Sequence, residues 1–339
     1  MDHRWSISIL CAALSCMAAQ KNRFRDSFFT LFSEVFGERI ATILILLYLS
    51  SGILGIGTIA AGIGQYLSFF GIDDILLIEL LIIALFWGIN LIGITLSGIT
   101  ENLLTALKVI PLVVIALLLL PSVELQNLTP LVPITATGLV TTVLLVYWPF
   151  TGFEISTIPV DEMRDSRMVP YALAIVMLVV SAVYLLLNIA LIGSVGSAVL
   201  AASPAPIATA AALIFSRSGS IVAVIGIIAM LSALNAYLVG GSRLLHSTAV
   251  ALHVNSLTSL NPRGAPMAPL LLIAILSAGI LFLTNSFEAL AVLSVLTTLV
   301  PYLFFCIGAY RVVPGFSKRL ITIAGIASCG GLLLLSFLF

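Results

Sequence analysis

Long apolar runs separated by short polar connections extend along nearly the whole sequence. A helix needs about 20 mainly apolar residues to span a bilayer, whereas a strand of an outer-membrane barrel alternates apolar and polar positions. The runs are long and do not alternate, so the pattern predicts membrane-spanning helices. Ten segments are candidates: 5–20, 40–70, 74–97, 103–121, 136–160, 168–193, 219–249, 267–285, 287–310 and 320–339.

One connection is expected to contain a short helix of its own. Ser203-Pro204-Ala205-Pro206 precedes an alanine-rich run. Serine is a favoured helix N-cap and proline a favoured first helical residue. The sequence therefore predicts a helix capped by Ser203 that begins at Pro204.

Basic residues set the expected orientation in the membrane. Two of them, Arg4 and Arg217, fall on one side of the predicted bundle, and ten fall on the other: Lys21, Arg23, Arg25, Arg39, Arg164, Arg167, Arg263, Arg311, Lys318 and Arg319. Cytoplasmic loops carry the excess of Lys and Arg, so the basic side is predicted to be cytoplasmic. The opposite side is acidic by comparison, with Asp73, Asp74, Glu79 and Glu124.

Composition excludes several classes of protein. The chain is 61% hydrophobic and 8% charged, against about 25% charged residues in a soluble domain. Its net charge is zero, so a nucleic-acid partner has no electrostatic support and the lipid bilayer is the expected surrounding. The four cysteines lack zinc-ligand spacing, and no catalytic motif such as His-Glu-x-x-His occurs. Neither an enzyme nor a cofactor is expected.

The lengths of the segments suggest two repeats of opposite topology. The longest segments, 40–70 and 219–249, are five apart in order, as a five-plus-five transporter architecture requires. The expected organisation is one transmembrane domain over residues 1–339, with 1–121 as an incomplete first repeat, 136–310 as the second and 320–339 as an extra helix. One helix is then expected to be missing at the N-terminus. The alternative is a complete ten-helix protein whose first span is weak.

The strongest candidate site lies inside segment 136–160, in the run Trp148-Pro149-Phe150-Thr151-Gly152-Phe153-Glu154. A charged side chain at the centre of a spanning helix costs about 2.5–3.5 kcal/mol on insertion scales and marks a site by default. Proline removes an amide donor and glycine tolerates non-helical conformations. The run therefore predicts an interrupted helix whose carbonyl groups bind a substrate ammonium. The alternative is a simple proline kink.

The same run resembles the W-x-F-x-G-x-E pattern in the sixth helix of amino acid–polyamine–organocation transporters. The loop that follows, 160–170, is similar to the acidic and basic loop of that family. Ser232-Ala233-Leu234-Asn235-Ala236-Tyr237 resembles its eighth helix, and 102–111 its fifth. The resemblance covers nearly the whole chain as family helices two to eleven. The chain departs from the family in that the first family helix is missing. In the family, that helix supplies backbone groups that bind the carboxylate of the substrate.

The resemblance implies roles for several side chains. Trp148 and Phe150 would form a wall or gate of the substrate site; the alternative is ordinary packing. Lys108 would stand where sodium-coupled relatives hold their ion and would support proton coupling. The alternative for Lys108 is a side chain that extends to the membrane surface.

Three further polar residues complete the candidate site. Glu154 is a proton carrier, a cation partner or a structural acceptor for backbone amides at the break. Ser232 and Asn235 are three residues apart and share one helix face. They contact substrate or join neighbouring helices by hydrogen bonds.

Two functions from different classes remain open. The first is secondary active transport of amino acids or related amines across the cytoplasmic membrane, with coupling to a proton or another cation. The second is a truncated, non-transporting remnant or a membrane scaffold with the same fold. The sequence names neither the substrate nor the coupling ion.

Overall fold

The computed structural model describes residues 28–92, 98–129, 135–152, 169–215, 217–312 and 316–338. Every regular element within those ranges is helical, which confirms the all-α fold class. The elements of the first half are α2 (Phe28–Phe36), α3 (Glu38–Ser68), α4 (Ile75–Ile92), α5 (Gly98–Leu119), η1 (Leu120–Ser122), η2 (Leu125–Leu128), α6 (Ala136–Tyr147) and η3 (Trp148–Phe150). Those of the second half are α7 (Val169–Val195), α8 (Ser197–Ala202), α9 (Pro206–Ala211), α10 (Ser218–Ala251), η7 (Asn255–Leu257), α11 (Met267–Leu283), α12 (Phe287–Val312) and α13 (Phe316–Leu338).

The predicted spans agree with these helices wherever the structure describes the chain. Six helices are long and apolar enough to cross a membrane, and they lie in α3, α4, α7, α10, α12 and α13. Three shorter apolar helices correspond to the predicted segments 103–121, 136–160 and 267–285. The predicted segment 5–20 lies outside the described residues.

Two short helices differ from the prediction. The helix in the loop before α10 begins at Pro206, with Ala205 as its N-cap, rather than at Pro204. The Ser203 hydroxyl instead accepts a hydrogen bond from the Ala205 amide at 3.1 Å and bonds to Thr209 Oγ1 at 2.6 Å. The serine thus supports the turn that precedes the helix. Helix α2 was not predicted, because its nine residues are too few for a span.

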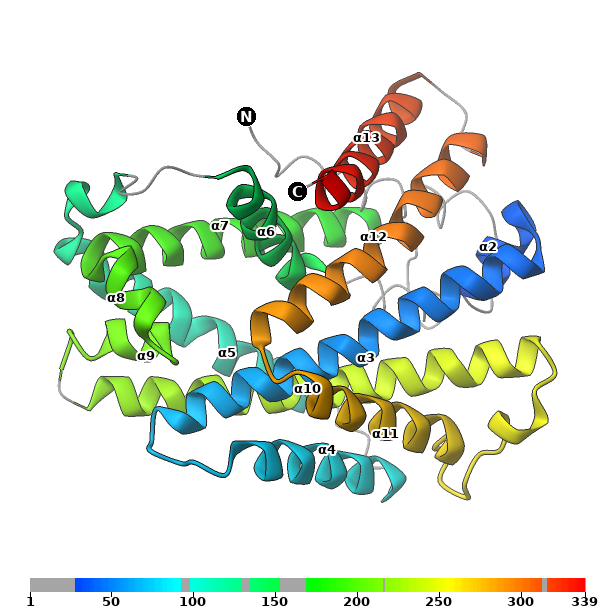
Figure 1. The fold of residues 1–339 in the computed structure, drawn as a ribbon, viewed down its shortest axis with the longest axis horizontal. Coiled ribbons are helices and arrows are strands. Elements are labelled where there is room, and N and C mark those ends of the chain that lie inside the picture. Colours follow the sequence, from blue (N-terminus) through cyan, green and yellow to red (C-terminus); the bar gives the residue numbers. More distant parts are fainter. Residues whose placement is uncertain are drawn as a thin grey trace.

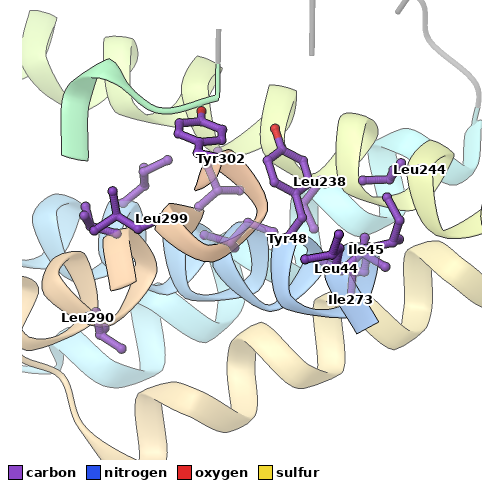
Figure 2. Packing of buried hydrophobic residues seen from close by; sticks show 14 of the residues in the cluster. Leu44, Ile45, Tyr48, Leu238, Leu244, Ile273, Leu290, Leu299 and Tyr302 are labelled. Atoms are coloured by element: carbon purple, nitrogen blue, oxygen red, sulfur yellow. The ribbon is translucent and has the colours of Figure 1, made fainter. Parts of the chain in front are cut away.

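Helix α3 forms the centre of the bundle. Figure 1 shows it crossing the middle of the molecule, and it packs against α2, α4, α10, α11 and α12. Its buried residues include a run of small side chains, Gly55 to Gly64, interleaved with isoleucines. Small residues let helices approach closely inside a membrane. Figure 2 shows the apolar cluster in which Leu44, Leu238, Ile273 and Leu299 from four helices meet.

A second cluster joins α5, α7 and α9. It contains Ile115 and Leu119 from α5, Leu187 and Leu191 from α7, and alanines from α9. Beside the large core around α3, the described part of the bundle therefore has this smaller core at its side.

The outer faces of the helices are apolar. Leu77, Leu81 and Leu85 follow one another at every fourth position of α4 and are each 58% exposed, as expected of a face that contacts lipid. Helices α3 and α10 have 31 and 34 residues. At about 1.5 Å per residue both exceed a hydrocarbon core of about 30 Å, so both are expected to tilt.

Candidate functional site

Helix α6 stops inside the predicted span. It begins with Thr135 as N-cap, whose hydroxyl accepts a hydrogen bond from the Gly138 amide at 3.1 Å. It ends at Tyr147, and a single 3₁₀ turn, η3, follows. The predicted interruption between Pro149 and Gly152 is therefore present.

The residues after η3 leave helical geometry altogether. Thr151 is extended, with φ −93° and ψ 155°, and Gly152 has φ +88°. Only glycine adopts such a positive φ without steric cost. The amide and the hydroxyl of Thr151 both donate to the carbonyl of Trp148, at 3.0 and 2.7 Å. These bonds close the last turn and direct the chain away from the helix axis.

The interrupted end of the helix lines a cavity between α3, α10, α11 and α12. Thr151 and Gly152 form part of its wall, and Ser51, Tyr237 and Thr298 supply polar groups from three helices. The volume of the cavity, measured as the space available to the centre of a water molecule, is about 30 Å³. That space holds about one or two waters and is too small for an amino acid in this conformation.

Tyr237 lies across the cavity between two glycines. A methyl group placed on Gly152 would lie 2.9 Å from the Tyr237 hydroxyl oxygen. A methyl group on Gly55 of α3 would lie 2.9 Å from Tyr237 Cε1. The missing side chains of these two glycines leave the space that the ring occupies. Tyr237 thus connects α10 to α3 and to the broken end of α6.

A second tyrosine contacts the break from α12. The Gly152 amide donates to the hydroxyl of Tyr302 at 3.4 Å, which is long for a hydrogen bond. Tyr302 is fully buried in the core cluster. Its label in Figure 2 places it beside Leu299 on the same helix. The non-helical backbone is therefore packed against protein, which is the condition for irregular backbone at membrane depth.

Three buried hydroxyl groups join α3 to α12 at the same cavity. Ser51 Oγ is hydrogen-bonded to Thr298 Oγ1 and lies 3.3 Å from Ser294 Oγ. Ser294 donates to the Ser51 carbonyl at 3.0 Å. Ser51 and Thr298 line the cavity. These hydroxyl groups thus form a polar contact between α3 and α12 beside the break.

The structure brings two predicted site residues together across helices. Lys108 Nζ, on α5, donates to Ser232 Oγ, on α10, at 2.7 Å. Both residues lie well inside their helices and are partly buried. The lysine therefore points into the bundle in this structure rather than away to the membrane surface.

The other predicted polar residue on α10 bonds to a different helix. Asn235 Oδ1 accepts a hydrogen bond from Asn90 Nδ2, on α4, at 2.7 Å. Neither Ser232 nor Asn235 lines the cavity. Both join neighbouring helices, which was the second of the two roles considered for them.

The aromatic residues of η3 pack against neighbouring helices. The Trp148 ring meets Phe287 of α12 edge to face at 5.5 Å between centroids, and Phe150 meets Tyr184 of α7 at 5.3 Å. Neither lines the cavity, so a gating role stays a prediction. The buried indole nitrogen of Trp148 has no hydrogen-bond partner among the described residues. Phe153, Glu154 and the charged loop 161–167 lie outside the described residues.

Several residues around the break were missed from the sequence. Tyr48, Ser51 and Thr298 line the cavity, and Tyr302 contacts the Gly152 amide. The pair Ser50-Ser51 followed by Gly52 is a polar interruption in an apolar segment, and it was the available signal for Ser51. Nothing in the sequence distinguishes Thr298 from its neighbour Thr297.

Glu79 lies within the predicted segment 74–97 and was assigned to the acidic side of the bundle. In the structure it lies one turn inside α4 and is fully buried. Asp73 and Asp74, just before the helix, are exposed. The sequence did not predict that the Glu79 side chain faces protein.

Comparison with known proteins agrees with this architecture. A family model described as amino acid permease matches residues 6–339. No curated protein matches the chain. The match covers almost the whole sequence, including the broken helix and every span that the structure describes. This chain therefore belongs to the amino acid permease family, and it is a multi-pass membrane transporter of amino acids or related substrates rather than an enzyme.

Proposed function

We propose that this permease is a secondary active transporter of the cell membrane, and that its substrate binds where Thr151 and Gly152 line the cavity. The interrupted helix α6 is the observation that carries the proposal. Broken helices near the midplane form the binding sites of many secondary transporters, because non-helical peptide groups are available to a ligand. We further propose that α3 and α10, the two longest helices, occupy equivalent places in two repeats.

The chemistry of the cavity favours a small neutral substrate. Apart from tyrosine hydroxyls, the described lining residues carry no ionisable group, and most of them are apolar. Peptide carbonyls and hydroxyls would bind an ammonium group, and the apolar wall would contact an aliphatic side chain. A dication such as a polyamine would need carboxylates that the described lining lacks. A zwitterionic amino acid with an apolar side chain fits best.

Substrate entry requires that Tyr237 move. Its ring lies against Gly152 and Gly55, and the remaining volume is about 30 Å³. An amino acid therefore binds only after the ring turns away or α10 shifts relative to α3. In this proposal Tyr237 closes the site in the conformation described.

Proton coupling is proposed to act through Lys108. Its ammonium group bonds to Ser232 and so links α5 to α10. A lysine that loses its proton becomes a hydrogen-bond acceptor as well as a donor. Gain and loss of the proton would then change the bond between the two helices during the transport cycle.

Uptake by the purified full chain in liposomes tests the proposal. Radiolabelled amino acids are offered with and without an imposed pH gradient, and binding is measured separately by equilibrium dialysis. Accumulation of an aliphatic amino acid only with the gradient is expected. Binding without any uptake would indicate the scaffold function, and uptake that ignores the gradient would overturn proton coupling.

A matched pair of variants locates the site. Thr151→Val keeps the shape of the side chain and removes the hydroxyl in the cavity wall. Thr142→Val makes the same change on α6, where the hydroxyl donates to the Gly138 carbonyl of its own helix. Weaker binding in the first variant with unchanged binding in the second is expected. Equal binding in both would place the substrate elsewhere.

A further inference from the structure

A buried carboxyl group on α4 lies apart from the cavity and from Lys108. Helix α4 has 18 residues, and only Glu79 and Ile83 are buried. These two are four apart and face the bundle together. Glu79 is the only ionisable residue of the helix. The one acidic side chain of α4 therefore faces the bundle, whereas most other side chains of the helix are apolar and not buried.

The carboxyl group packs directly on the backbone of α3. A methyl group built on Gly64 would overlap Glu79 Oε1 and Ile75 Cγ2. The missing side chain of Gly64 therefore leaves the space that the carboxyl oxygen occupies. The contact is too close for a metal ion or an ammonium group to lie between the carboxyl oxygen and α3.

No described residue satisfies the carboxyl oxygens. Both are buried without a hydrogen-bond partner of standard geometry. Asn285, in the loop between α11 and α12, is the polar side chain that approaches the group, but it does not complete such a bond. Burying an ionised carboxylate without a partner is very costly, and burying the neutral acid costs far less.

Charged groups around this end of the bundle do not supply the missing partner. The helices packed against α4 are α3, α10 and α11, and α11 contains no ionisable residue. Near this end, the ionisable residues of α3, α10 and the connections are Tyr66, Asp73, Asp74, Arg217 and Glu288. None of these described residues is hydrogen-bonded to Glu79.

We propose that Glu79 is a proton-binding site at the interface of α3 and α4, distinct from the substrate cavity and from Lys108. A proton is the one cation that needs no additional volume, which suits the close contact with Gly64. With the proton bound, α4 packs on α3 as observed. After the proton leaves, the charged group requires water or a donor, so the ends of α3 and α4 must separate or the loop at Asn285 must rearrange.

The topology places this site near one membrane surface. Glu79 lies one turn inside α4, and the short connection 69–74 joins α4 to the end of α3. The charge distribution along the chain predicts that this surface faces away from the cytoplasm. Protons would therefore reach Glu79 from outside the cell.

Infrared spectroscopy of the full chain in lipid tests the proposal without requiring transport. Glutamate labelled with ¹³C at the carboxyl carbon identifies the stretching band of a protonated glutamic acid. We expect this band at neutral pH in the unaltered protein and a weaker band in Glu79→Gln, which lacks the contribution of Glu79. Glu288→Gln is the matched control, because Glu288 is an exposed glutamate at the start of α12, and it should retain the band.

A second variant tests the packing itself. Gly64→Ala should force the carboxyl group out of its contact with α3 and weaken the band at neutral pH, although Glu79 is still present. Gly88→Ala, on α4 with open space around it, should leave the band unchanged. If Gly64→Ala does not fold, the comparison of the unaltered protein with Glu79→Gln still tests whether Glu79 binds a proton.

Absence of the band in the unaltered protein at neutral pH would overturn the proposal, as would a band of undiminished intensity in Glu79→Gln. Because the spectrum is measured on the resting protein, this outcome is independent of whether uptake responds to a pH gradient. Failure of the proton site and failure of proton-coupled transport are therefore distinguishable.

Discussion

At the scale of single residues, two glycines decide where larger groups can lie. Gly152 allows the backbone to turn at the break and leaves room for the Tyr237 hydroxyl. Gly64 leaves room for the Glu79 carboxyl. In each case a larger side chain occupies the space beside a glycine of another segment: Tyr237 beside Gly152, and Glu79 beside Gly64. A larger residue at either glycine would displace that side chain.

Gly152→Ala is predicted to destabilise the protein and weaken substrate binding. Alanine at φ +88° is strained by roughly 1–2 kcal/mol, and its methyl group would also meet Tyr237. Thermal unfolding in detergent and equilibrium dialysis measure the two effects. Gly88→Ala, a helical glycine with no neighbour within 4 Å, should not lose stability. Equal stability of the two variants would contradict the strain argument.

Lys108→Gln is predicted to abolish uptake driven by a pH gradient while substrate binding persists. Glutamine still donates a hydrogen bond toward Ser232 but cannot gain or lose a proton in the physiological range. Liposome uptake at fixed substrate concentration measures the effect. Ser232→Ala serves as the comparison, because it removes the acceptor and leaves the lysine. Gradient-driven uptake that survives in Lys108→Gln would exclude this residue as the coupling group.

At the scale of helices, the hydroxyl cluster is the clearest polar link between α3 and α12. Much of the interface between the two helices is apolar, and Ile59 and Leu290 belong to its core cluster. Inside a membrane, helices are held by close packing and by such interhelical hydrogen bonds. The cluster should therefore fix how α12 is positioned against α3.

Thr298→Val is predicted to lower the free energy of unfolding by about 0.6–1.7 kcal/mol, the range found for interhelical hydrogen bonds in membranes. It removes the hydroxyl that bonds to Ser51 and keeps the shape of the side chain. Thr297→Val is the control, because Thr297 Oγ1 donates to the carbonyls of Leu293 and Ser294 on its own helix. Chemical unfolding in detergent measures both. A larger loss in the control would contradict the assigned role of the cluster.

At the scale of the whole molecule, the small cavity predicts a change of accessibility during transport. Ser51 lines the cavity and is 7% exposed, so Ser51→Cys, in a chain whose native cysteines are replaced by alanine, should react slowly with a water-soluble thiol reagent. An added substrate or a changed pH gradient should alter the rate. Leu125→Cys, at a position 79% exposed, should react quickly under all conditions. A constant rate at Ser51→Cys would argue against a moving gate.

Local chemistry made much of this architecture predictable. Apolar runs of about 20 residues or more predict spans whatever the rest of the chain does, because every backbone polar group must be satisfied within the helix. Proline followed by glycine predicts the break at Gly152 for an equally local reason. The short helix at Pro206 was misplaced by two residues, since Pro204 and Pro206 are equally good first residues.

The tertiary structure alone decided which side of each helix faces protein. A spanning helix is apolar on all sides, so its sequence has no stripe that separates a lipid-facing side from a buried one. For that reason the chain by itself did not reveal that Glu79 is buried on α3, that Lys108 reaches Ser232, or that Ser51 and Tyr237 meet at the cavity. The sequence determined that the chain crosses a membrane and where one helix breaks; the packing of helices determined which polar groups that break brings together.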